Sequence, residues 1–417
     1  MPNLDFGKLS KAQKIIWPIL IGALVVGAFV AFPLLFDGKI NGDIVPEPVL
    51  PVEEPEAPLP VSLEIICVGD IMIHEPQLAS QYDPQTGTYN YENNFQYVKK
   101  YIEQADLALG NFEGTFGGPP YRGYPAFSAP DELASALKNN GFDVVITANN
   151  HMVDRGHDGV LRTLEVLQKE GLTTSGSRRE DTDPNYSISE AEGVKIGVVA
   201  YTYETSGSGP EVSINGNYIS QETASKINSF SYNRLDADLV KIKDTVHQAR
   251  EAGAQVILLY LHWGEEYQSV PNLWQEQIVN HAVNDMQVDV IFASHPHVLQ
   301  KMEMVSSEMG NRKVPVFYSM GNFISNQRQE TLQNRFTEQG MIARVNLDIE
   351  ASSGKILDIR MDAIPTWVDR YGRNGKTVYE VIPLDEEMES NPALLESGHL
   401  TRAREAREDI NGILELN

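Results

Sequence analysis

From Ser62 onward, short apolar runs alternate with amphipathic stretches. The apolar runs end in turns and have the length of buried strands, whereas the amphipathic stretches carry apolar residues at helical spacing and stop at glycine. Strands that alternate with helices predict an α/β fold with largely buried sheets. The clearest predicted strands are "SLEIICVGD", "ADLALGNFEG", "FDVVITANNH", "GVKIGVVAYT", "AQVILLYLHWG" and "VDVIFASHPH", and the clearest helices are "DELASALKNNG", "DGVLRTLEVLQKEG" and "DADLVKIKDTVHQAREAG".

The pattern changes in the C-terminal third, where strands follow one another without helices. The runs are "KVPVFYSMGNF", "GMIARVNLDIE", "KILDIRMDAIP" and "KTVYEVIPL". They predict a second sheet, mixed or antiparallel. The acidic segment 385–417 is expected to be helical and peripheral, so the folded domain is expected to cover residues 62–384.

An uncharged apolar stretch, "IIWPILIGALVVGAFVAFPLLF", occupies residues 15–36 and is long enough to span a bilayer. Lys8, Lys11 and Lys14 precede it, which favours a cytoplasmic segment 1–14 and places the rest of the chain outside the cell. A cleaved signal peptide is the alternative, but its apolar region is normally shorter and no small-residue cleavage site follows Phe36. We therefore expect an uncleaved, single-pass anchor in the cell membrane.

Residues 37–61 are rich in proline and glutamate ("VPEPVLPVEEPEAPLPV") and predict an extended spacer between the membrane and the domain. The whole chain has 33 Lys and Arg against 58 Asp and Glu, a formal net charge of -25. That charge argues against nucleic-acid binding and against broad attachment to anionic lipid. Cys67 is the single cysteine, so no intrachain disulfide can form, and we expect it in a buried strand.

Polar residues follow five of the predicted strands. Because ligand sites in α/β proteins lie beyond the carboxyl ends of the strands, these side chains are expected to converge. The last of them flank Pro296, which cannot continue a central strand. In chain order the residues are Asp70 and His74; Asn111 and Glu113; Asn150, His151 and Asp154; His262; and His295 and His297.

Carboxylate, carboxamide and imidazole ligands without thiolate suit Zn, Mn or Fe(II), and also Mg. Two divalent ions about 3.5–4 Å apart would need a bridging carboxylate and further ligands on each side, and this set is large enough. An additional histidine beside the ions could protonate a leaving group. We expect Asp154 to cap the following helix rather than to act on a substrate.

Six blocks occur in order between Leu63 and Asn326: "VGDIMIH", "GNFEG", "ITANNHMVDRG", "LHWGEEY", "ASHPHVLQ" and "YSMGNF". Together they resemble the poly-gamma-glutamate capsule synthesis protein (CapA) family. That family is related to the calcineurin-like metallophosphoesterases. The resemblance implies a four-layer α/β/β/α sandwich, preceded here by one transmembrane helix, and a dinuclear metal site.

The resemblance also implies roles for single residues. His151 corresponds to the acid, and Asn322 in "YSMGNF" is a candidate for orienting a ligand. Two positions depart from the metallophosphoesterase pattern: Asp70 and His74 are spaced Asp-x-x-x-His instead of Asp-x-His, and Glu113 stands where the bridging residue is an aspartate. The metal ligands implied are Asp70, His74, Glu113, Asn150, His262, His295 and His297.

Three functions follow as alternatives. The first is a role in making, exporting or attaching poly-gamma-glutamate or another anionic envelope polymer, beside a membrane ligase complex, with a metal-dependent hydrolase-type site. The second is a cell-surface metallophosphoesterase unrelated to capsule. The third is a non-catalytic scaffold of the polymer machinery. Arg122 is a candidate for holding an anionic group, with a solvated loop residue as the equal alternative.

Overall fold

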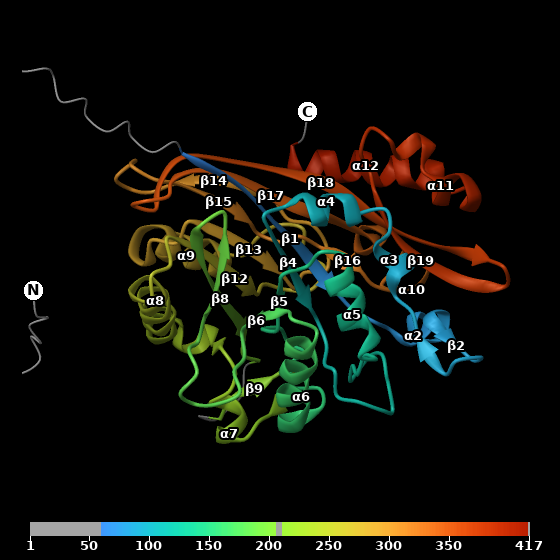
Figure 1. Cartoon of the computed structure of the whole chain (residues 1–417), viewed down its shortest axis with the longest axis horizontal. Coiled ribbons are helices and arrows are strands. Elements are labelled where there is room, and N and C mark those ends of the chain that lie inside the picture. Colours follow the sequence, from blue (N-terminus) through green and yellow to red (C-terminus); the bar gives the residue numbers. More distant parts are fainter. Residues whose placement is uncertain (1–59, 206–210, 416–417) are drawn as a thin grey trace, which may run out of the picture. The chain divides into compact units, whose positions relative to one another are not determined.

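The computed structural model describes residues 60–205 and 211–415. These residues form a mixed α/β unit with an eight-stranded and a seven-stranded sheet, so the predicted α/β class is confirmed (Figure 1). The predicted transmembrane span 15–36 and nearly all of the predicted linker lie outside the described residues. Within the part of the chain that the structure describes, no helix combines the length and apolar character needed to cross a bilayer.

The strand order of the first sheet is β19-β18-β17-β1-β4-β5-β6, with β16 paired to β1. β1, β4, β5 and β6 run parallel, while β17, β18 and β19 continue the sheet antiparallel on the other side of β1. The strands are β1 (Val61–Ile71), β4 (Leu107–Phe112), β5 (Val144–Ile146), β6 (Thr173–Ser175), β16 (Asn322–Ile324), β17 (Gln339–Glu350), β18 (Lys355–Arg373) and β19 (Lys376–Pro383).

The strand order of the second sheet is β11-β8-β12-β13-β15-β14, with β7 paired to β8. Its strands are β7 (Ser187–Ala191), β8 (Val194–Tyr203), β11 (Ser229–Phe230), β12 (Val256–His262), β13 (Val290–Ser294), β14 (Met302–Ser306) and β15 (Lys313–Phe317). Two short hairpins stand apart from the sheets: β2 (Tyr82–Asp83) with β3 (Thr88–Tyr89), and β9 (Ser213–Ile214) with β10 (Asn217–Tyr218).

Helices flank the sheets. They are α2 (Glu75–Gln81), α3 (Glu92–Phe95), α4 (Lys99–Gln104), α5 (Glu132–Asn139), α6 (Gly156–Lys169), α7 (Gln221–Ala224), α8 (Leu235–Glu251), α9 (Leu273–His281), α10 (Gln329–Leu332), α11 (Pro392–Ser397) and α12 (Leu400–Leu414). Short 3-10 turns cover Tyr232–Arg234, Arg335–Glu338 and Met388–Ser390, and a π-helical turn, Ala282–Met286, follows α9.

Each central strand is buried on both faces, and alternate side chains enter different cores. On β1, Ile65 and Cys67 pack between the two sheets, whereas Ile66 and Val68 pack against α3, α4 and α5. On β12 the even positions, such as Leu258 and Tyr260, lie in the inter-sheet core, and the odd positions pack against the helices α8 and α9. Period-two alternation in a strand covered on both sides explains the continuous apolar runs. Cys67 is fully buried, as predicted.

Three of the four late runs join the first sheet instead of building a separate one, so the prediction is wrong for them; the first run supplies β15 of the second sheet. β17 pairs with β1 over eight residue pairs, from Val61 with Ile349 to Val68 with Ile342. β18 pairs with β17 and β19 pairs with β18, so both extend the same sheet. The second sheet is built instead mainly from β8, β12, β13 and β15. Sequence pattern shows that a strand exists, but the partner of a strand is decided by packing of segments far apart in the chain.

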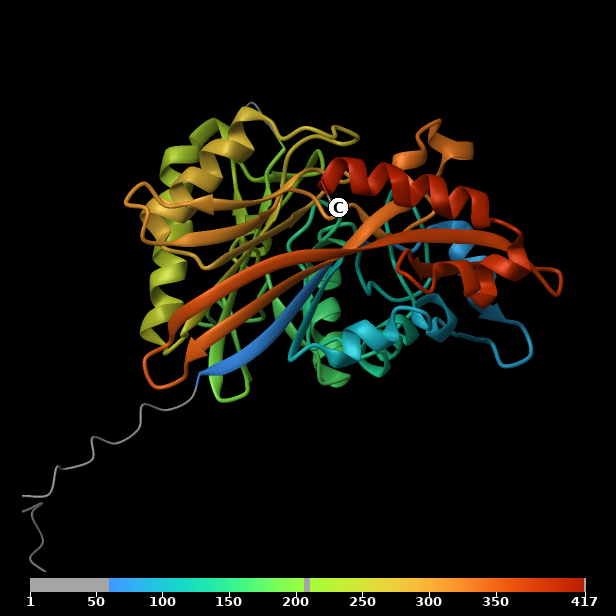
Figure 2. The same cartoon turned by 90° about the horizontal axis from the view of Figure 1, so that it is seen from above.

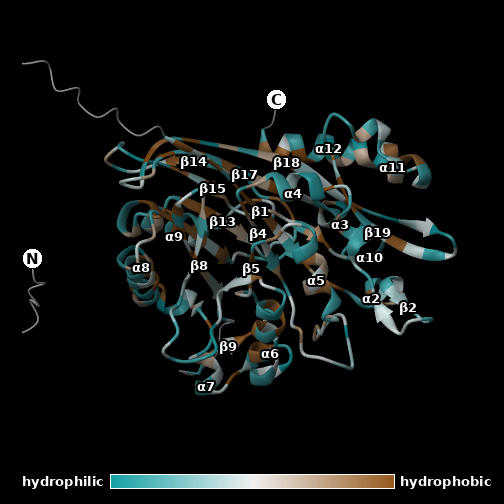
Figure 3. Ribbon diagram, viewed as in Figure 1, coloured by the Kyte–Doolittle hydropathy of each residue, from teal (hydrophilic) through white to brown (hydrophobic). Residues whose placement is uncertain are grey.

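The acidic segment after Asp385 is helical but is not peripheral. Ala393 and Leu394 of α11 and Ala403, Ala406 and Ile410 of α12 belong to the same core cluster as the inter-sheet residues. Figure 2 shows α12 lying along the long antiparallel strands of the first sheet. Charged residues take the outward side of such helices, as the teal surface of α8 illustrates in Figure 3, so net acidity does not mark a helix as detached.

Gly69 allows β16 to approach β1 next to Asp70. The amide of Asp70 donates to the carbonyl of Gly321 at 3.0 Å, and a Cβ on Gly69 would lie 2.0 Å from that carbonyl oxygen. We expect Gly69→Ala to lower the free energy of unfolding by about 1–3 kcal/mol, because backbone must move to admit the methyl group.

The matched control is Gly372→Ala on β18, where a Cβ meets no atom within 4 Å. That change should alter the free energy of unfolding by no more than about 0.5 kcal/mol. Urea unfolding of both variants, followed by circular dichroism, measures the difference. Equal destabilisation of the two variants would contradict the close approach.

Candidate metal centre

The candidate site lies where parallel strands of both sheets end. In the first sheet, Asp70 on β1 is in register with Asn111 on β4, and Glu113 follows directly after β4. In the second sheet, His262 ends β12 and is in register with Ser294, the last residue of β13. The expectation that the polar strand ends converge is therefore met by the geometry of both sheets.

The converging side chains are removed from solvent almost completely. Their exposed fractions are 0% for Asp70, 0% for Glu113, 1% for Asn150, 3% for His151, 0% for His262, 2% for His295 and 1% for His297. Ionisable residues are rarely buried to this extent unless they are paired or hold a metal.

His297 joins the two sheets. Its Nδ1 lies 3.1 Å from Oδ2 of Asp70 and 3.1 Å from Oδ1 of Asn322. Its Nε2 lies 3.7 Å from Oε1 of Glu113, which is too long for a hydrogen bond. The His297 ring therefore lies between Asp70 and Glu113.

Two groups of side chains have the geometry of metal ligands. Glu113, His295 and His297 form one group, and Asp70, Glu113 and His262 form the other; within each group the ligand atoms lie within 4.8 Å of one another. Glu113 belongs to both groups. Asn150 adjoins the second group, because its Oδ1 lies 3.0 Å from Nε2 of His262.

Buried polar atoms at this place lack partners. Both carboxylate oxygens of Glu113 and Nδ1 of His295 have no hydrogen-bond partner among the described residues. A buried acceptor without a partner costs about 1–3 kcal/mol, and a charged one more. Divalent cations between these atoms would satisfy all three, so the residues fit a metal centre.

The electrostatics of the cluster favour the same ligand. Burial, with Asp70 close by, raises the pKa of Glu113 well above its usual value. Burial, with neighbouring imidazoles, lowers the pKa of His262 and of His295 well below theirs. The histidines are therefore neutral, with lone pairs available to a cation, and two acidic side chains lie beside them. A positive ion would reverse the unfavourable setting of the Glu113 carboxylate.

The backbone of the His-Pro-His segment is held in an unusual conformation. His295 has φ 104° and His297 has φ 57°, values that residues with a Cβ adopt rarely. Such conformations cost of order 1–3 kcal/mol and concentrate at functional sites. They direct both imidazoles toward Glu113, with the ring centroids 5.9 Å apart.

His151 lies outside both ligand groups and has a carboxylate partner. Its Nδ1 lies 2.8 Å from Oδ2 of Asp154, which also accepts a hydrogen bond of 2.7 Å from the amide of Phe127. Asp154 does not cap the following helix: the residue before α6 is Arg155, without a side-chain cap. The prediction for Asp154 is therefore wrong, and the spacing His-x-x-Asp on one turn is the signal that would have indicated the pair.

His74 lies outside both ligand groups as well. It precedes α2, its Nδ1 accepts from the amide of Asn326 at 3.3 Å, and burial lowers its pKa to about 4. Its ring meets Phe127 edge-on at 5.2 Å, and Phe127 meets His151 in the same way at 4.7 Å. Its role as a metal ligand stays a prediction.

Two asparagines hold candidate ligands in position; the sequence predicted an orienting role for Asn322 but assigned no such role to Asn111. Nδ2 of Asn111 donates to Oδ1 of Asp70 at 2.8 Å, and Asn322 lies against His297. Both are in register with Asp70, Asn111 on β4 and Asn322 on β16. Partners of this kind fix the orientation of metal ligands. The side chain of Arg122 is exposed, as expected for a solvated loop residue.

The sequence model for the family described as "Bacterial capsule synthesis protein PGA_cap" matches residues 64–327, more than half of the 417 residues. The chain belongs to this family. The match contains every residue of both ligand groups, together with His74, Asn150, His151 and Asn322.

Individual relatives of this PGA_cap chain are distant. It is 28% identical over 291 residues to "Capsule biosynthesis protein CapA" of Bacillus anthracis, covering 66% of this chain and 64% of that protein. It is 29% identical over 271 residues to "PGA biosynthesis protein CapA" of Bacillus subtilis (strain 168), covering 62% of each. The chain thus spans just under two thirds of the length of these relatives.

Among solved structures, a novel phosphatase from Mycoplasma pneumoniae is similar with a TM-score of 0.41 and 14% identity, over 74% of this chain and 95% of that chain.

Proposed function

We propose that this chain acts on an envelope polymer through a hydrolase-type centre that holds two divalent ions of Mn, Zn or Fe. The observation that carries the proposal is the position of Glu113, whose two unpartnered, buried oxygens are shared by two ligand groups. A carboxylate so placed suits a bridge between two ions. The helices outside each of the two facing sheets support a four-layer α/β/β/α sandwich of the metallophosphoesterase type.

When bound, such ions would polarise a phosphoryl or acyl oxygen and lower the pKa of water. The chain supplies the other requirements. His151 keeps Nδ1 on Asp154, so Nε2 is the atom that can exchange a proton with a leaving group. Asn111 and Asn322 hold Asp70 and His297 in position, and the surrounding core excludes bulk water from the ligands.

We further propose that the domain is extracytoplasmic and anchored by residues 15–36 in the cell membrane, where it works beside a membrane ligase complex. The names of the two CapA relatives support poly-gamma-glutamate or a related anionic polymer as the material handled. Because the chain itself carries a net charge of -25, such a polymer would be repelled from most of its surface. Cations in the centre would provide the local attraction.

The test uses the full chain, loaded with Mn, Zn or Fe(II) and then freed of excess ions. Elemental analysis should find about two equivalents, and hydrolysis of bis(p-nitrophenyl) phosphate or of γ-glutamyl-p-nitroanilide should stop when a chelator removes them. Hydrolysis of the phosphodiester alone would favour a surface phosphoesterase. Absence of bound metal under all loading conditions would overturn the proposal and leave a scaffold role.

A further inference from the structure

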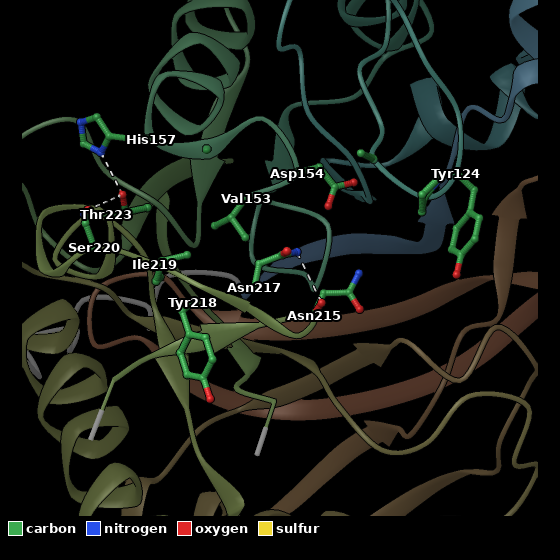
Figure 4. Close-up of a pocket in the computed structure, with 13 residues that line it drawn as sticks. Tyr124, Val153, Asp154, His157, Asn215, Asn217, Tyr218, Ile219, Ser220 and Thr223 are labelled. Carbon is green, nitrogen blue, oxygen red and sulfur yellow. Dashed lines mark hydrogen bonds between the residues drawn. The ribbon is translucent and has the colours of Figure 1, made fainter. Parts of the chain in front are cut away.

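A cavity of about 690 Å³ opens beside Asp154, the carboxylate partner of His151 (Figure 4). Asp154, whose carboxylate holds Nδ1 of His151 at 2.8 Å, lines it, and so does Tyr124, whose ring centroid is 6.4 Å from that of His151. Its volume lies in the range of about 300–1,000 Å³ that is usual for ligand sites. The cavity therefore adjoins the carboxylate that holds His151, the side chain assigned to proton exchange.

The wall opposite Tyr124 is held by its own small core. Met152 and Val153, in the turn before α6, and Val160 within the helix pack with Ile214 and Ile227, which fixes the β9–β10 hairpin against the helix. His157 adds a contact of 3.3 Å between its Nδ1 and Oγ1 of Thr223. Because packing within the chain holds the wall, the cavity is formed before any ligand arrives.

The cavity offers no cation to a carboxylate-rich ligand. Its described lining contains one carboxylate, Asp154, and one imidazole, His157, and neither lysine nor arginine. Nε2 of His157 already lies 3.7 Å from Glu222. The guanidinium of Arg155 donates to the carbonyl of Pro120 at 3.3 Å. A chain of γ-linked glutamates would bring one negative charge per residue to a wall that carries an acid.

The lining suits an uncharged, hydroxylated ligand instead. Tyr124 and Tyr218 are 71% and 57% exposed, and each presents an aromatic face together with a polar hydroxyl. Asn215 and Asn217 lie between them in Figure 4 and offer amide donors and acceptors. A sugar ring has the matching surfaces: apolar C–H faces for the tyrosines, and hydroxyl or acetamido groups for the amides.

We propose that this cavity is a subsite for an uncharged sugar unit of the substrate, placed next to the group on which His151 acts. The proposal rests on the proposed function, since it assigns the cavity to the same reaction. It divides recognition in two: the metal centre attracts the anionic part of a substrate, and the cavity between Tyr124 and Tyr218 selects a neutral glycan part. The anionic polymer would then be handled in connection with a sugar-bearing acceptor or carrier.

Calorimetric titration of the full chain with chitotriose and with maltotriose tests the proposal, with tri-γ-glutamate as the anionic probe. At least one sugar should bind. Tyr218→Ala and Tyr124→Ala should each raise its Kd about tenfold, as expected for losing an aromatic contact. Tyr82→Ala is the matched control, because Tyr82 is also exposed, at 39%, but lies on β2 outside the cavity.

The results separate this subsite from the metal centre. Sugar binding that persists in Glu113→Ala, which removes the shared ligand, would support the subsite even if no hydrolysis is found. Binding of tri-γ-glutamate without either sugar would overturn the proposal. So would sugar binding that both tyrosine variants leave unchanged, or the absence of sugar binding in a chain that binds its metals normally.

Discussion

Glu113→Ala is expected to abolish binding of both metal ions, whereas loss of a ligand from one group alone should leave one ion. Glu113 is the residue that the two ligand groups share, and neither of its oxygens has another partner among the described residues. Elemental analysis after loading with Mn or Zn should fall from about two equivalents to none. His295→Ala, which removes a ligand from one group only, should retain about one.

The stability of the metal-free chain provides the control for Glu113. A buried carboxylate without hydrogen bonds destabilises the fold, so the metal-free Glu113→Ala variant should unfold at the same temperature as the parent or at a higher one. Glu165→Ala, an exposed change on α6, should alter neither metal content nor unfolding. Retention of two metal equivalents in Glu113→Ala would contradict a bridging role for Glu113.

His151→Ala is expected to lower the rate of hydrolysis about 10²–10⁴-fold while metal content stays at the parent value. The reason is position: His151 belongs to neither ligand group, but its Nδ1 is held by Asp154, which lines the cavity. Steady-state kinetics with the phosphodiester and γ-glutamyl substrates, beside elemental analysis of the same preparations, measures both quantities.

His247→Ala is the matched control, because His247 has a side chain 71% exposed on α8 and contacts only Glu251 among the ion pairs. A parent rate in His151→Ala would show that another group donates the proton. Loss of metal together with activity would make His151 a ligand instead. The hydrolysis rate of Asp154→Asn should fall between that of His151→Ala and that of the parent, since the imidazole remains but its charged partner does not.

The metal-ligand candidates show how much of the site can be predicted from local sequence pattern. Asp70, Glu113, His262, His295 and His297 were all indicated by one rule, that polar residues at the carboxyl ends of buried strands meet in α/β folds. The rule needs only the positions of strand ends, which hydrophobic runs mark in the sequence. His74 was indicated by the same rule, but it lies beside Phe127, outside both ligand groups.

The residues that support the ligands could not be predicted fully from local sequence, because their contacts join segments that are distant in the chain. Asn322 contacts His297, 25 positions away, at the point where β16 pairs with β1 and His297 meets Asp70, 227 positions away in the chain. Asp154 and His151 are close in the chain, but the amide of Phe127, 27 positions away, also donates to the Asp154 carboxylate and so fixes its orientation. A polar residue in a turn can cap a helix or orient a neighbour, and sequence alone does not distinguish the two.

Local sequence was enough to predict the α/β class, the places where strands end, the family resemblance and most of the candidate ligands, because apolar periodicity and residue chemistry are local properties. The tertiary structure decided that β17, β18 and β19 extend the first sheet, that α11 and α12 complete a core, and that Glu113 lies in both ligand groups. It also created the cavity lined by Asp154 and Tyr124. Strand partners, register and cavities depend on contacts between distant segments, and those are selected by the packing of the whole core.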